Sequence, residues 1–174
     1  MKHWKKNLGV CFVVLSLIIL SLQPNIALAS REKKPENIVY FVRQGITGDC
    51  SSWKEACDLQ VALHLANDGD EIWVGAGTYV PTHTNNRYAS FSLRSGVILY
   101  GGFPSEGGSW EERDWELHTT TLSGDIGISG DISDNSYHVI IGYYLSATTV
   151  LDGFIINGGN ANGNDEYQDG GGIY

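Results

Sequence analysis

The feature that most constrains this chain is a set of short strand-like runs that lack the connections ordinary sheets use. Four runs of β-branched, aliphatic and aromatic residues are bounded by glycine, asparagine or aspartate, and they span residues 71–74, 97–100, 138–141 and 154–156. No two runs are joined by a two-residue Asn-Gly or Asp-Gly hairpin, which disfavours an antiparallel meander. No helical pattern separates them, which excludes alternating strands and helices. Short strands with glycine corners and irregular loops predict a solenoid.

One amphipathic helix is predicted before these runs, over residues 53–67. The segment Ser52-Trp53-Lys54-Glu55 matches a capping box, in which the serine oxygen and the glutamate carboxylate satisfy free backbone donors. An apolar face follows with spacings of three and four residues, formed by Leu59, Ala62, Leu63 and Ala66. With a strand over residues 38–42, this helix is expected to form a cap over residues 38–70, followed by the first coils over residues 71–174.

The amino terminus has the three-part layout of a secretory signal. Lys2, Lys5 and Lys6 precede an uncharged run over residues 8–22, and Ala27-Leu28-Ala29 supplies small residues for cleavage after Ala29. We therefore expect a signal peptide over residues 1–29 and an exposed leader over residues 30–37. A signal anchor is the alternative, because the run is near the lower limit for spanning a bilayer. After cleavage no membrane span is expected.

The charge of the chain excludes two classes of partner. The formal net charge is −9, and it falls to about −12 once the three amino-terminal lysines are removed with the signal. Nucleic acids and anionic membrane surfaces require clustered Lys and Arg, so neither is an expected partner.

Two cysteines remain after signal cleavage, Cys50 and Cys57. An even count in an exported chain predicts a disulfide between them. Two reduced thiols are the alternative, because the sequence does not establish the geometry.

A series of ordered motifs gives the chain a family resemblance. The cap region carries Asp58-Leu59-Gln60, Gly69-Asp70-Glu71-Ile72-Trp73-Val74 and Gly77-Thr78-Tyr79, and later motifs include Leu122-Ser123-Gly124-Asp125 and Leu151-Asp152-Gly153-Phe154. This order resembles the amino-terminal part of bacterial exported right-handed parallel β-helix proteins, which have a pectin-lyase-like fold and include polymorphic-outer-membrane-protein-like chains. The resemblance implies an all-β right-handed parallel β-helix with one amphipathic capping helix, located outside the cell or at the cell surface or outer membrane.

The family usually continues with further Gly-Gly-x-Ile-Tyr coils after the first. Here that element, Gly170-Gly171-Gly172-Ile173-Tyr174, is the last of the sequence. The resemblance therefore implies a β-helix that is incomplete at its carboxy end.

Carboxylates are the most numerous groups with possible chemistry. Asp125, Asp131 and Asp134 lie within ten residues and form a weak candidate Ca²⁺ site, with simple Gly-Asp turns as the favoured interpretation. Asp125 and Asp152 are the pair to consider for a glycosidase. No catalytic or cofactor-binding residue is predicted and no cofactor is expected to be required, although Ca²⁺ is possible.

Aromatic residues give a further candidate for ligand contact. Trp110 and Trp115 fall in a predicted loop, whereas Trp53 and Trp73 are expected to pack the cap onto the first coil. Two functions stay open. The first is a non-catalytic adhesion or binding role toward glycans or surface proteins. The second is a polysaccharide lyase or glycoside hydrolase whose catalytic coils lie beyond Tyr174.

Overall fold

The computed structural model describes residues 37–174. The predicted signal peptide over residues 1–29, its cleavage site after Ala29 and all but the last residue of the leader lie outside this part of the chain.

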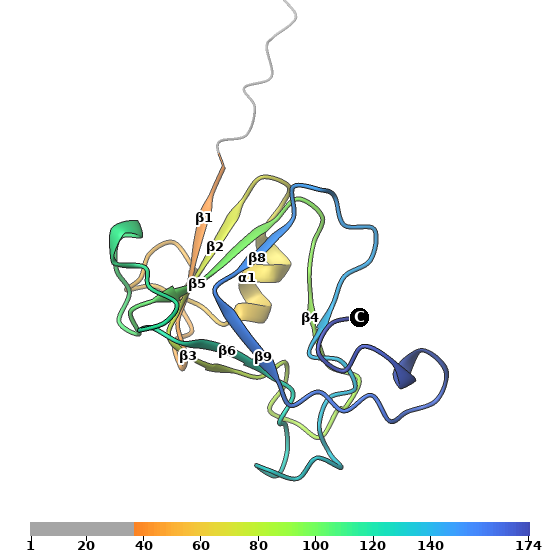
Figure 1. Cartoon of the computed structure of the whole chain (residues 1–174). Helices are drawn as coiled ribbons and strands as arrows, with labels where there is room; N and C mark the ends of the chain where they lie inside the picture. The colour runs from red at the N-terminus through yellow and green to blue at the C-terminus, as the bar shows by residue number, and fades with distance from the viewer. Residues whose placement is uncertain (1–36) are drawn as a thin grey trace, which may run out of the picture. The chain divides into compact units, whose positions relative to one another are not determined.

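All the strand pairs that form the three sheets are parallel, and most of the strands are short (Figure 1). The first sheet has the order β1-β2-β5-β8, with β1 Val39–Val42, β2 Glu71–Gly75, β5 Ile98–Phe103 and β8 Val150–Asp152. The second has the order β3-β6-β9, with β3 Gly77–Tyr79, β6 Thr120–Ser123 and β9 Phe154–Asn157. The third pairs β4 Phe91–Ser92 with β7 Ile140–Ile141. Three helical segments complete the set, α1 Leu59–Leu65 and the 3₁₀ turns η1 Trp110–Glu112 and η2 Asp165–Gln168.

The prediction of an all-β right-handed parallel β-helix is wrong. The strands form three separate small sheets that do not close into a solenoid, and the chain is a small mixed structure with short helical segments. The third sheet shows the physical reason, because β4 and β7 each contribute only two residues to its ladder. Long segments without strands lie over residues 80–90, 104–119 and 124–139, and the second of them contains η1. The backbone pairing is therefore interrupted where a solenoid would require it to continue.

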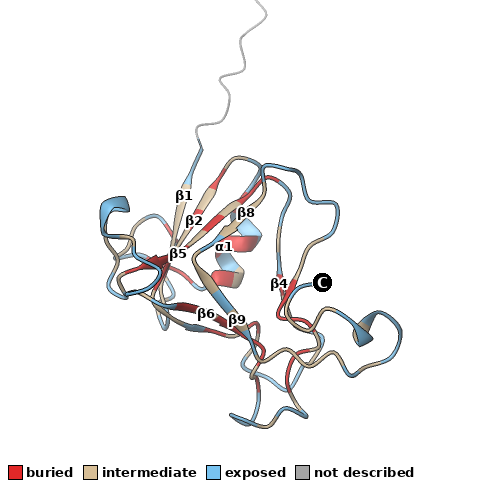
Figure 2. Cartoon of the chain, in the orientation of Figure 1, coloured by how far each residue is buried: buried red, intermediate tan, exposed pale blue. Residues whose placement is uncertain are grey.

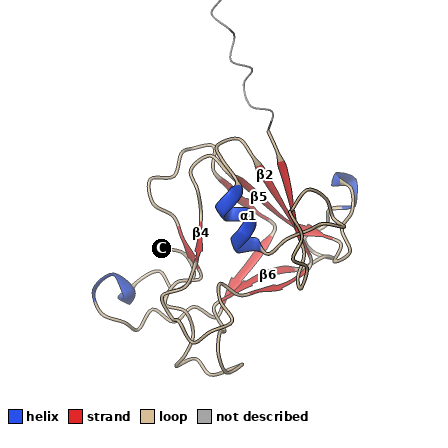
Figure 3. Ribbon diagram, turned by 180° about the vertical axis from the view of Figure 1, so that it is seen from behind, coloured by secondary structure: helices blue, strands red, loops and turns tan. Residues whose placement is uncertain are grey.

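A single apolar cluster joins the helix to the sheets. Val42, Ile72, Val74 and Leu99 contribute buried side chains from the first sheet. The buried face of α1 packs into the same cluster, and Figure 3 shows the helix lying between β4 and the β2 and β5 strands. In Figure 2 buried residues are concentrated on β2, β5, β6 and α1, while most residues of the connecting loops are exposed or half-buried.

The helix begins later than the predicted residue 53. Asp58 is its N-cap, and the carboxylate of Asp58 accepts a hydrogen bond of 2.8 Å from the backbone N–H of Gln60. Ser52 Oγ does accept from the Glu55 N–H at 3.2 Å, but these residues form a turn. The helix cannot include Cys57, because Cys57 is paired with Val42 in an extended parallel bridge.

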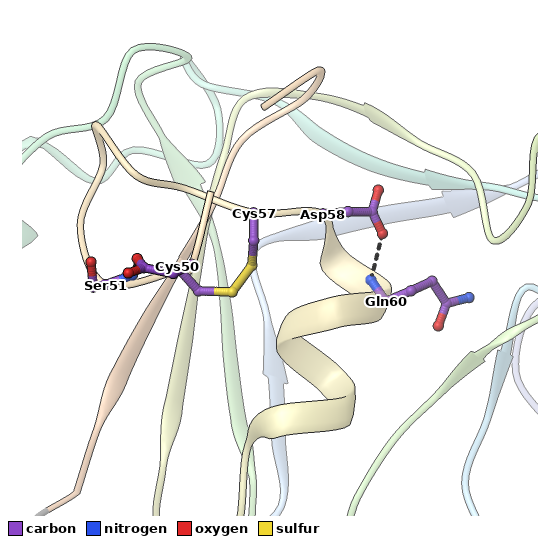
Figure 4. The surroundings of a disulfide bond; sticks show 6 residues. Cys50, Ser51, Cys57, Asp58 and Gln60 are labelled. Carbon is purple, nitrogen blue, oxygen red and sulfur yellow. Dashed lines mark hydrogen bonds between the residues drawn. A yellow bond between two sulfur atoms is a disulfide. The ribbon is translucent and has the colours of Figure 1, made fainter. Parts of the chain in front are cut away.

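That bridge belongs to a loop that covers the outer edge of β1. Cys50 and Cys57 are joined by a disulfide, and both are almost fully buried (Figure 4). The Phe41 N–H donates to the Cys50 carbonyl at 2.9 Å, and the Cys57 N–H donates to the Phe41 carbonyl at 3.0 Å. The loop therefore satisfies backbone groups of β1 that a sheet edge would otherwise expose.

Candidate functional site

A sharp corner between β8 and β9 positions the first part of the candidate site. Gly153 forms the corner with a φ of +79°, a conformation that favours glycine. A Cβ at this position would lie 2.7 Å from the Gly101 carbonyl oxygen and 2.6 Å from Arg113 Nη2. The corner thus requires glycine both for its backbone angle and for its close packing.

Arg113 is held rigidly behind this corner. Its Nε donates to the Gly101 carbonyl at 2.7 Å, and its Nη2 forms an ion pair with Asp152. The guanidinium also lies over three aromatic rings, at 5.1 Å from Tyr100, 5.4 Å from Trp110 and 5.3 Å from Trp115. Because its side chain is only 8% exposed, Arg113 orients its neighbours and is not a free cation for a ligand.

The two loop tryptophans differ in what they contact. Trp110 packs on Tyr100 with a centroid distance of 4.8 Å and also contacts Trp73 and Phe103, so it belongs to a large aromatic cluster. Trp115 is 57% exposed. Its backbone packs tightly on Gly102, whose carbonyl accepts a hydrogen bond from the Asp114 N–H, so the exposed ring stands on a fixed main chain.

Trp115 lines a depression of about 230 Å³ at the corner. The other lining residues come from β6 and from the β8–β9 turn, and they are Thr120, Asp152, Gly153, Phe154 and Ile155. We call this the Trp115 depression. It combines an exposed aromatic face with a half-exposed carboxylate, that of Asp152.

A second depression of about 500 Å³ lies at the other end of the same strands. Six of its nine lining residues have polar side chains, and the full set is Thr78, Thr121, Ser123, Asp125, Gly130, Ile132, Asn135, Asn157 and Gly158. We call this the Asp125 depression. One lining residue, Asn135, is only 4% exposed, and its Oδ1 is a buried acceptor without a hydrogen-bond partner.

The two depressions adjoin on the outer face of the second sheet. Thr121 on β6 and Ile155 on β9 are register partners. Thr121 lines the Asp125 depression, and Ile155 lines the Trp115 depression. Neighbouring strands are about 4.8 Å apart. A ligand that fills both depressions therefore crosses this pair of side chains.

The predicted Ca²⁺ ligands do not come together. Asp125 accepts from the Gly130 N–H at 3.0 and 3.1 Å, Asp131 accepts from the Ser133 N–H at 2.9 Å, and Asp134 accepts from the Ile128 N–H at 2.8 Å. Hydrogen bonds from Ser133 also hold the pKa of Asp131 below its ordinary value. Within residues 37–174 no three His, Cys, Asp or Glu side chains are grouped to hold a metal ion, so calcium binding gains no support.

Asp125 and Asp152 lie beyond opposite ends of the β6–β9 ladder. Asp125 follows the Ser123–Asn157 pair of the β6–β9 ladder, whereas Asp152 precedes the Thr120–Phe154 pair. The ladder between them alone is about 10 Å long. Glycoside hydrolases hold their two carboxyl groups about 5 to 9.5 Å apart, so the register gives no support to this pair.

A third depression, of about 360 Å³, lies beside α1. Two of its polar side chains, those of Gln60 and Arg94, already have partners in the fold. Gln60 Nε2 donates to the Pro81 and Ser90 carbonyls at 3.0 Å, and Arg94 Nη1 donates to the His64 carbonyl at 2.6 Å. These bonds tie the helix to neighbouring loops, so we assign this depression a structural role.

No family model, curated protein or solved structure matches this chain. The family resemblance of the sequence motifs therefore stays a prediction. Among the helices of residues 37–174, none has the length and apolar character needed to cross a bilayer.

Proposed function

We propose that this chain is an exported or cell-surface protein that binds glycans without chemical conversion, through the Trp115 and Asp125 depressions. The observation that carries the proposal is the exposed Trp115 ring beside the Asp152 carboxylate, at the end of a polar surface. A sugar ring has an apolar C–H face and a polar rim, and it matches an aromatic face flanked by hydrogen-bonding groups.

The length of the surface favours a chain of sugars over a single sugar. The two depressions follow β9 from Phe154 to Asn157, which is about 10 Å of strand. Thr78 and Thr121 supply hydroxyls along this path, and Asn157 supplies an amide. These groups donate and accept hydrogen bonds, as the hydroxyls of a saccharide require.

Two features support export. The amino terminus has the residue pattern of a secretory signal, with small residues at Ala27 and Ala29. The Cys50–Cys57 disulfide is typical of proteins that fold in an oxidising compartment.

The test is calorimetric titration of residues 30–174 with N-acetylated chitotetraose, cellotetraose and laminaritetraose. We expect at least one of these neutral tetrasaccharides to bind, and Trp115→Ala to weaken that binding by about 2 kcal/mol, or roughly 30-fold, because the stacking face is lost. Trp115→Phe should restore part of the affinity.

Tyr144→Ala is the matched control. Tyr144 is 99% exposed and lines neither depression, so its removal should leave binding unchanged. Absence of binding to all three sugars, or equal loss in the two alanine variants, would contradict the proposal.

A further inference from the structure

We infer that the free edge of β9 is a self-association surface, along which a second copy of this chain adds its own β9 in the antiparallel direction. This inference does not depend on the proposed glycan binding. It derives from the contrast between covered and free sheet edges, from the direction of the backbone groups of β9 and from the absence of charge beside them.

The two ends of the sheets differ in how their edges are covered. The loop closed by the Cys50–Cys57 disulfide takes up backbone groups of β1, and Gln44 Nε2 donates to the Thr78 carbonyl of β3 at 3.0 Å. In the third sheet, the residues that follow η2 pair with β7. β8 and β9 are the last strands of the first two sheets, and within residues 37–174 no strand pairs with their outer sides. The free edges of the described chain therefore lie at one end, along β8 and β9.

The hydrogen bonds of β9 define which of its backbone groups are free. The Gly124 N–H donates to the Asn157 carbonyl at 2.9 Å, so the backbone groups of Asn157 point toward β6. Successive residues of a strand direct these groups to opposite sides, so those of Ile155 also point toward β6. The N–H and carbonyl groups of Phe154 and Ile156 point outward. Among the hydrogen bonds of the described residues, none outside the β6–β9 ladder involves these four groups.

These four groups are arranged to pair with a copy of themselves. In an antiparallel pair centred on Ile155, Phe154 lies opposite the partner's Ile156, and the two residues exchange both of their hydrogen bonds. The two Ile155 side chains then face each other as the closer, non-hydrogen-bonded pair. Ile155 is 51% exposed in a single copy, so the pairing also covers apolar surface. The contact has two-fold symmetry, so association along this edge ends at two copies.

Charge favours this edge over the rest of the surface. The formal net charge of the chain is −9, so two copies repel each other in most orientations. Residues 153–164 contain no charged residue and no proline, the features that usually keep a strand edge free of partners. The nearest carboxylate, that of Asp152, is paired with Arg113 and falls opposite the partner's Gly158 in this register.

The leader of the same chain is unsuited to cover the edge. Residues 30–36 include five charged residues and one proline, whereas the edge is uncharged and offers donors and acceptors to a continuous strand. A second β9 matches the edge in length, in backbone pattern and in the apolar side chain at its centre. We therefore assign the edge to a second copy.

The test is sedimentation equilibrium of residues 30–174 at increasing protein concentration. We expect the mean mass to rise from one copy to two across roughly 5 to 500 µM, since a contact of this small size gives weak affinity. Ile155→Lys places two ammonium groups opposite each other and should weaken association about tenfold. Ile155→Glu should do the same with two carboxylates.

An equimolar mixture of Ile155→Lys and Ile155→Glu is the deciding sample. Opposite charges then face each other, so association should return as a mixed dimer, which a variant that merely fails to fold would not form. Ile128→Lys is the matched control, because Ile128 is 67% exposed and lies in the loop over residues 124–139, so its association should equal that of the wild type. A single copy at every concentration, unchanged association in Ile155→Lys, or a mixture that stays dissociated would overturn the inference.

Discussion

The disulfide that closes the loop over β1 gives the sharpest prediction about stability. We consider the double variant Cys50→Ala and Cys57→Ala. Both cysteines are buried, with 0% and 1% exposure, so alanine introduces no polar group into the core. Cys50 has a φ of +68°, and alanine bears the same backbone penalty as cysteine at that angle, so this penalty cancels in the comparison.

The expected magnitude comes from the length of the loop. The bonded residues are seven apart in sequence. Without the bond, the unfolded chain regains the entropy that closure of this loop removes, which lowers the free energy of unfolding by about 2.4 kcal/mol. For a folded part of this size, an unfolding entropy of about 2.1 cal/mol/K per residue converts that free energy into a lower Tm by about 8 °C.

The assay is thermal unfolding followed by circular dichroism. The oxidised wild type, the wild type with reductant and the double variant are compared. Reductant should lower the Tm of the wild type to near that of the variant and should leave the variant unchanged. If the variant melts within about 2 °C of the oxidised wild type, the loop does not constrain the chain in the way that the entropy argument requires.

Two further predictions concern buried polar groups. Asp70 is 7% exposed and accepts hydrogen bonds of 2.9 Å from the Ile38 and Asn67 N–H groups. In urea titrations Asp70→Ala should therefore lower the free energy of unfolding by about 3 kcal/mol. Asp169→Ala, at an exposed position, should change it little. Burial of the hydroxyl in the core raises the pKa of Tyr79 well above its ordinary value of 10.0. The hydroxyl donates a hydrogen bond to the Gly75 carbonyl. The folded protein therefore resists ionisation of Tyr79, so this group's contribution to stability is present below pH 10 and is lost as the pH rises above it. Tyr79→Phe should flatten this alkaline loss of stability in urea titrations, and an unchanged slope would contradict the assignment.

Local patterns in the sequence predicted part of the fold. The strand over residues 38–42 corresponds to β1, and the runs over residues 71–74 and 154–156 lie in β2 and β9. The run over residues 97–100 overlaps β5, and only the last two residues of the run over residues 138–141 form a strand, β7. These runs are apolar and β-branched, so their tendency to form strands is local. The helix was predicted six residues too early, because Ser52 and Glu55 fit a capping box while tertiary pairing holds Cys57 in an extended bridge.

The same local patterns do not predict whether the sheets close into a solenoid. Whether parallel strands join into one solenoid depends on how many residues each strand pairs with its neighbour in each of the sheets. β4 and β7 pair through only two residues each, and no motif in the sequence indicates so short a ladder. The resemblance to β-helix proteins therefore predicted a closure that the chain does not make.

The sequence predicts only part of the candidate site. The sequence indicates Trp115 as a loop aromatic residue for ligand contact and Asp125 as a candidate carboxylate. Alternation along β9 was a usable signal for the rest, because Ile155 and Asn157 are exposed while Phe154 and Ile156 are less so. The meeting of the two depressions depends on the register of Thr121 with Ile155, which no local pattern specifies.

The most direct test of glycan binding at this surface is a proton–nitrogen NMR titration of residues 30–174 with chitotetraose, acetylated and deacetylated in turn. Each tryptophan gives one indole N–H signal. Trp53 donates to the Gly108 carbonyl and Trp73 to the Glu71 carboxylate, so their signals serve as internal controls. We expect the Trp115 indole signal and the backbone signals of residues 152–158 to shift together while the Trp53 and Trp73 signals stay in place. Shifts confined to other regions, or no shift with either form of the sugar, would contradict the proposed binding surface.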